Sequence, residues 1–168
     1  MRRSRGSLIE DAFDDIGPIL CLLSVIGFIA WVAFLAAADR VMKRVEPENR
    51  RIDPGQVWLN LIPIFNLLWI VVMIERVGES IRNEYIVRGR HKVSESYGKT
   101  AGLAFVVLSW VGIGIPMVAG SLNAVPCSIV FWFFSFIYWV VYWTQISNYA
   151  RKLRSESGSY APPSDEGW

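Results

Sequence analysis

The sequence contains few residues that bind metal ions or form disulfides. Its 168 residues include two cysteines and one histidine. A structural zinc site takes about four such ligands, and a disulfide framework needs several pairs of cysteines. The chain therefore offers no metal or cofactor site of its own, and we predict none.

An excess of charge of one sign is also absent. The chain has 17 Lys and Arg against 15 Asp and Glu, so its formal net charge is only +2. Proteins that bind nucleic acids neutralise many phosphates with basic residues. The balance of charge therefore predicts that nucleic acids are not partners of this protein.

Charged residues are missing altogether from three long stretches, at 16–38, 57–74 and 100–150. The first would extend roughly 34 Å as an α-helix, enough to cross a hydrocarbon layer of about 30 Å. The third is too long for one crossing, and turn-forming residues at 120–126 divide it. We therefore expect an all-α bundle in the lipid bilayer, with four transmembrane helices at about 16–38, 54–88, 100–119 and 127–150.

The second predicted helix has the clearest start. Residues 53–56, Asp-Pro-Gly-Gln, form a capping-box pattern with proline at the first helical position. Beyond the apolar stretch, Val77, Ile81 and Tyr85 recur every four residues among charged ones. This spacing predicts a short cytoplasmic helical overhang with one packed face, which Gly89 would end.

Three residues interrupt the apolar character of the second stretch. Pro63 lacks the N–H that would bond to the carbonyl of Leu59, which predicts a kink in the helix. Asn60 and Asn66 carry amides that must find partners on another helix or on the backbone. We expect these residues to serve helix packing, and the alternative is that they line a polar cavity or pore.

Two topologies remain open. Four spans with the N-terminus inside place the five basic residues of the first loop outside, whereas a re-entrant second stretch leaves only the three N-terminal basic residues outside. The positive-inside rule favours the re-entrant arrangement. The capped, continuous second helix favours four spans, which we prefer. Both topologies place the C-terminus in the cytoplasm.

Four aromatic residues share one face of the last predicted helix, at spacings of four, three and four. They are Trp132, Phe136, Trp139 and Trp143. We expect this face to pack against lipid or protein, which makes it a candidate interface. After it, Arg151, Lys152 and Arg154 are placed to contact anionic lipid head groups, at about 1 kcal/mol each.

The stretch from Glu46 to about Arg88, with its motif PGQVWLNLIPIFNLLW, resembles a family of bacterial multi-pass membrane proteins that contain a domain of unknown function. The stretches KTAGLAFVVLSW and YWTQISNYARKL resemble it more loosely. The resemblance implies a small helical protein of a bacterial cytoplasmic membrane and brings no catalytic residues. We expect one domain over residues 1–154 and a disordered polar tail over 155–168.

The apolar stretches also limit the function. Charged side chains within a membrane mark proton relays and ion pathways, and these stretches have none. We favour a non-enzymatic subunit that self-associates or accompanies another membrane protein. The alternatives are a small pore or solute carrier lined by Asn60, Pro63 and Asn66, and a lipid-acting enzyme that uses Glu46 and Asp53. We assign no catalytic residue.

Overall fold

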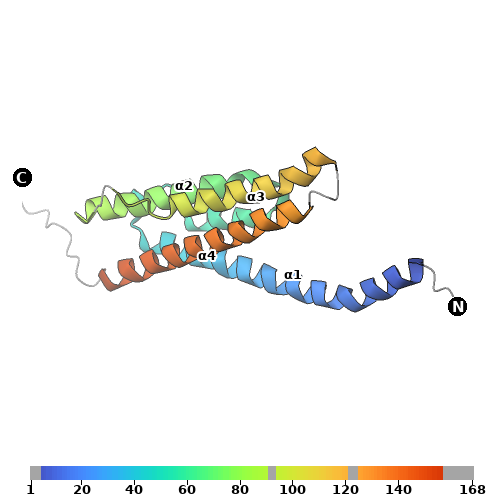
Figure 1. Cartoon of the computed structure of the whole chain (residues 1–168). Helices are drawn as coiled ribbons and strands as arrows, with labels where there is room; N and C mark the ends of the chain where they lie inside the picture. Colours follow the sequence, from blue (N-terminus) through green and yellow to red (C-terminus); the bar gives the residue numbers. More distant parts are fainter. Residues whose placement is uncertain (1–4, 91–93, 121–124, 157–168) are drawn as a thin grey trace, which may run out of the picture. The chain divides into compact units, whose positions relative to one another are not determined.

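The computed structural model describes residues 5–90, 94–120 and 125–156, and most of these residues are in helices (Figure 1). Within these ranges there is no β-strand, so the predicted all-α class is confirmed. The elements, with η for a 3-10 helix, are α1 (Arg5–Arg44), η1 (Pro47–Asn49), η2 (Pro54–Leu61), α2 (Pro63–Val87), α3 (Lys99–Ala119) and α4 (Val125–Glu156).

The chain divides into two compact units, residues 1–34 and 35–168. The first unit contains the larger part of α1. Its apolar side chains between Ile16 and Ile29 are exposed, as expected of a helix surrounded by lipid. Ser24 satisfies its hydroxyl within the helix by donating to the carbonyl of Leu20 at 2.8 Å.

Three helices are long and apolar enough to cross a membrane: α1 from Ile16 onward, α3, and α4. They fit an integral membrane protein. Two of them are longer than the predicted 16–38 and 127–150, because each continues beyond its uncharged stretch into turns that contain both charged and buried residues. Ser155 and Glu156, which we placed in the tail, end α4; the rest of the predicted tail and the predicted turn at 121–124 lie outside the described residues.

The second predicted helix needs correction. Instead of one kinked helix over 54–88, the chain forms η2 and α2, separated at Ile62 with φ −84° and ψ 111°. Pro63 is the first residue of α2 rather than a kink within it, because a proline has no N–H to offer a preceding turn and suits the start of a new one. The predicted start at Pro54 is confirmed, with the Gln56 side chain accepting a hydrogen bond from the Asp53 N–H at 3.4 Å.

Helices α3 and α4 lie side by side (Figure 1). A Cβ added at Gly112 would lie 3.0 Å from the ring of Trp132, so this glycine lets the two helices approach closely. Between them, the hydroxyls of Ser109 and Ser135 are 2.6 Å apart, and the Ser135 hydroxyl also donates to the carbonyl of Phe105 at 3.0 Å. Small residues and one pair of hydroxyls thus hold this helical pair together.

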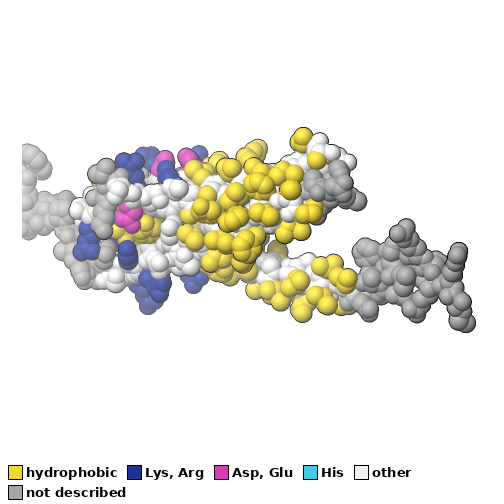
Figure 2. All heavy atoms as spheres, in the orientation of Figure 1, with side chains coloured by type: hydrophobic (Ala, Val, Ile, Leu, Met, Phe, Trp, Pro, Cys, Tyr) yellow, Lys and Arg dark blue, Asp and Glu magenta, His cyan; other side chains and the backbone are white. Residues whose placement is uncertain are grey.

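The best-packed part of the second unit is the polar end, which we define as residues 39–53, 75–90, 94–99 and 143–156. Figure 2 shows charged side chains over this end, whereas hydrophobic ones cover much of α3 and α4. The predicted packed face of the overhang is confirmed, since Val77, Ile81 and Tyr85 are buried. Gly89, with φ +66°, follows the end of α2 as expected.

Candidate functional site

The second apolar stretch forms a helical hairpin, here defined as residues 54–74, which folds at Ile62. Two contacts hold η2 against the first half of α2. The indole N–H of Trp69 donates to the carbonyl of Gln56 at 2.9 Å, and the side-chain amide of Asn60 lies 3.1 Å from the sulfur of Met73. The hairpin is therefore a packed structure rather than an extended loop.

The chain enters and leaves this hairpin at the same end of the second unit. Before the hairpin, the N–H of Arg51 donates to the hydroxyl of Ser80 at 2.8 Å, and the amide of Asn49 donates to the carboxylate of Glu84 at 2.8 Å. Both acceptors lie on α2 beyond the hairpin. A crossing helix would have placed these segments on opposite sides of a membrane, so the prediction of four spans is not confirmed.

Contacts between α2 and α3 give the depth that the hairpin reaches. A Cβ on Gly102 would lie 2.6 Å from Ile74, and one on Gly78 would lie 2.5 Å from Lys99, so α2 and α3 run antiparallel. Ile64 comes ten residues before Ile74. At 1.5 Å per residue, the tip therefore lies about 15 Å beyond the first turn of α3, roughly half of a hydrocarbon layer.

The tip of the hairpin is apolar and open. Ile62, Ile64 and Leu68 are 51%, 87% and 72% exposed. Ile62 precedes α2 without giving it a side-chain cap. The first N–H groups of any α-helix have no partner within the helix. An uncapped helix start and an exposed apolar surface therefore coincide at this tip.

The side-chain amides of the two predicted polar residues, Asn60 and Asn66, do not use all of their hydrogen-bonding groups within the described part of the chain. Asn60 is 2% exposed, and its amide nitrogen donates to the carbonyl of Val57 at 2.8 Å as well as contacting Met73. The Oδ1 atoms of Asn60 and Asn66 are buried, and neither has a hydrogen-bond partner among the residues that the structure describes. The nitrogen of Asn60 thus serves packing, while both oxygens retain unused capacity.

A buried carboxylate that sequence reasoning missed fixes the first loop to α2. The side chain of Glu84 is 1% exposed and accepts hydrogen bonds from the Glu46 N–H at 3.1 Å and from Asn49. It also accepts from the guanidinium of Arg88 at 2.8 Å. Glu84 lies seven residues after Val77, which is two helical turns along the packed face. This spacing could have identified Glu84 in the sequence as a buried residue.

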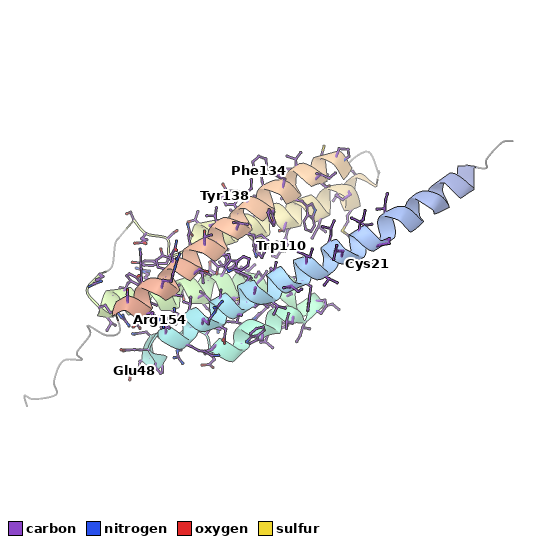
Figure 3. All side chains as sticks on the ribbon, turned by 90° about the horizontal axis from the view of Figure 1, so that it is seen from below. Cys21, Glu48, Trp110, Phe134, Tyr138 and Arg154 are labelled. Atoms are coloured by element: carbon purple, nitrogen blue, oxygen red, sulfur yellow. The ribbon has the colours of Figure 1, made fainter. Side chains whose placement is uncertain are left out.

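The four aromatic residues of the predicted interface do not form one uniform surface. Phe136 is exposed, whereas Trp139 is buried, and their ring centroids are 5.7 Å apart. Trp143 lies 5.2 Å from Trp139, and Trp132 covers Gly112. In Figure 3, Phe134 and Tyr138 mark the same part of α4. The role of this face as an interface stays a prediction.

The three predicted lipid-contacting residues lie together on the last turns of α4, and all are exposed. The guanidinium of Arg151 donates to the side chain of Asn148. The ammonium of Lys152 lies 5.8 Å from the ring centre of Tyr149. Figure 3 shows Arg154 near the end of α4. Their position agrees with the expected contact with head groups, which stays a prediction.

The structure gives no added support to catalysis by the first loop. The backbone of Glu46 is held by Glu84, and Asp53 is exposed at the start of η2. Within the described ranges, no group of three or more His, Cys, Asp or Glu is placed to hold a metal ion. Comparisons of the chain with protein families, with curated proteins and with solved structures found no match.

Proposed function

We propose that this protein is a non-enzymatic membrane subunit that self-associates or accompanies another membrane protein, with the hairpin tip as its contact surface. One observation carries the proposal: the break between η2 and α2 is exposed at the depth of the apolar helices. Ile62 at the break is 51% exposed, and Ile64 beside it is 87% exposed.

The physical reason lies in the solvent. Hydrocarbon offers no hydrogen bonds, so non-helical backbone at membrane depth is tolerated only where protein buries it or water lines it. The start of α2 lacks a side-chain cap. A second protein surface over the tip would remove this backbone from lipid and cover the side chains of Ile64 and Leu68.

The proposal includes a topology. The hairpin is re-entrant, and three helices, α1, α3 and α4, cross the membrane. The N-terminus lies outside. The loop before the hairpin, the loop between α2 and α3, and the C-terminus lie in the cytoplasm. This arrangement leaves only the three basic residues before α1 outside, in agreement with the positive-inside rule. The membrane is the cytoplasmic membrane of a bacterium, as the resemblance of the motif implies.

Site-specific photo-crosslinking tests the proposal. A photoreactive phenylalanine replaces Ile64 in one variant and the exposed Phe133 of α4 in a control, and both are irradiated in the native membrane. We expect the Ile64 variant to give a protein adduct of defined mass, either a second copy or one partner, and the Phe133 variant to give mainly lipid adducts. Mild-detergent purification with native mass then identifies the complex.

Two results together would contradict the proposal. The first is lipid adducts alone from position 64. The second is a purified protein that is strictly monomeric with nothing bound to it. Position 136 serves as a further comparison, because protein adducts there and none at position 64 would move the contact to the aromatic face of α4.

A second candidate function is a small pore or solute carrier. It is favoured by the buried Oδ1 atoms of Asn60 and Asn66, which lack partners within the described part of the chain. Water in a polar cavity would satisfy both. Solute flux into proteoliposomes should then fall when Asn60→Leu and Asn66→Leu are combined, and flux equal to that of the wild type would rule out this candidate.

A further inference from the structure

The polar end brings the last turns of α1 and α4 together. The guanidinium of Arg44 donates to the carbonyl of Ala150. In an α-helix this carbonyl points toward the residue four positions later, so the end of Arg44 lies beside the turn that contains Arg154. Figure 3 shows the end of α4, marked by Arg154, beside the end of α1. Two basic segments that are more than a hundred residues apart thus share one surface.

This surface, which we call the basic patch, consists of six cationic residues: Arg40, Lys43, Arg44, Arg151, Lys152 and Arg154. Arg40 precedes Arg44 by one turn and lies on the same side of α1. In residues 39–44 and 150–155 the one acidic residue is Asp39, which pairs with Lys43 at 2.7 Å and is itself buried. The positive charge of the patch is therefore largely uncompensated.

The surroundings of the patch are apolar on one side. On α4, Val140 and Val141 are exposed about three turns before Arg151, and exposed aromatic residues continue toward Phe133. A ligand on this surface would meet guanidinium groups at one level and apolar side chains at the next. Guanidinium groups bind phosphate oxygens through two parallel hydrogen bonds.

We propose that the basic patch is a binding site for the phosphate of an anionic phospholipid, whose acyl chains lie along α4. An isolated phosphate would use only the charged level of this surface. A phospholipid uses both levels, because its phosphate lies at the boundary where the exposed apolar face ends. The site joins α1 to α4, so an occupied site also bridges the two helices.

The rest of the polar end offers a matched comparison. Arg76 and Arg82 are exposed cations on α2, but the acidic residues Glu75 and Glu79 lie beside Arg76 in the sequence. Removal of these two charges changes the net charge of the protein as much as removal of two charges from the patch. General attraction to an anionic membrane would therefore respond equally to both changes.

The test uses the full-length protein in nanodiscs of phosphatidylcholine with a minor fraction of phosphatidylglycerol. Retained phosphatidylglycerol is counted by native mass spectrometry for the wild type, for Arg40→Gln with Arg154→Gln, and for the control Arg76→Gln with Arg82→Gln. We expect the patch variant to lose affinity by about fivefold for each removed charge, and the control to stay close to the wild type. Circular dichroism confirms that each variant is folded.

Two outcomes would overturn the proposal. Equal losses in the patch variant and the control would show a general attraction to the membrane instead of a site. Full displacement of the bound lipid by soluble glycerol phosphate at comparable concentration would show a site for free phosphate, in which the apolar level plays no part.

Discussion

The two regions of the second unit bury their apolar side chains to very different extents. In the polar end, Met42, Ile81, Ile146 and Leu153 are almost completely buried. In α3 and in α4, by contrast, only 22% of the residues in the most apolar 18-residue stretch of each helix are buried. We call residues 100–120 and 126–142 the apolar half. The less polar region in sequence is thus the less buried one in structure.

The difference follows from the solvent that each region meets. In water, burial of apolar surface stabilises a protein by about 25 cal/mol per Å². Lipid tails are as apolar as leucine, so helices in a bilayer gain nothing comparable and depend on close packing and a few hydrogen bonds. We infer that the polar end contributes most of the stability, while the apolar half provides the surface toward lipid and partners.

The largest effect should come from the buried carboxylate of the polar end. Glu84→Gln removes the charge that faces Arg88 and weakens the attachment of the first loop at Glu46 and Asn49. We expect a loss of about 3–5 kcal/mol in the free energy of unfolding, as for one partner removed from a buried ion pair. The loss is measured by denaturation with sodium dodecyl sulfate in mixed micelles.

Glu79→Gln is the control for this prediction, because it removes a carboxylate from the same helix in an exposed setting. Glu79 is 44% exposed and lies 3.2 Å from the ammonium of Lys99. An exposed pair contributes at most about 1 kcal/mol. Similar losses for the two variants would mean that the loop attachment at Glu84 does not stabilise the fold.

A pair of isoleucines on α4 tests the comparison between the two regions more directly. Ile146 is fully buried in the polar end, and Ile137 is 41% exposed in the apolar half. Ile146→Ala should cost about 2–5 kcal/mol, the usual cost of a cavity in a core. We expect Ile137→Ala to cost much less in the same denaturation assay, since lipid or detergent fills the space that it leaves.

Equal losses in the free energy of unfolding for Ile146→Ala and Ile137→Ala would contradict this difference between the two regions. They would mean that the exposed side of α4 is packed by protein under the conditions of the assay. Measurement over a range of protein concentrations separates this case, because a contact between copies makes the cost at Ile137 increase with concentration.

The helices α3 and α4 could be predicted from the sequence because long uncharged stretches leave few alternatives. The continuation of α1 to Arg44 could not be found by that rule, since its last turns carry charges and their packing depends on distant segments. Met42 and Val45 are buried there. Hydrophobic stretches locate what lies in lipid, but they do not show where a helix ends in water.

The hairpin shows a second kind of limit. Within a continuous helix Pro63 predicts a kink, but proline is also common at the first position of a new helix. Only the fold decided between these meanings. The apolar run from Pro63 to Ile74 has 12 residues, a length more typical of re-entrant or buried segments than of spans. The positive-inside rule also favours the re-entrant hairpin that we propose.

The smallest expected effect concerns the hydroxyl groups between α3 and α4. Ser135→Ala removes hydrogen bonds to Ser109 and to the carbonyl of Phe105, and interhelical hydrogen bonds in membranes average only about 0.6 kcal/mol. Ser80→Ala, in the polar end, leaves the N–H of Arg51 without its acceptor and should cost about 1–3 kcal/mol. If Ser135→Ala proved more costly than Ser80→Ala in the same assay, polar contacts within the apolar half would carry more of the stability than its low burial indicates.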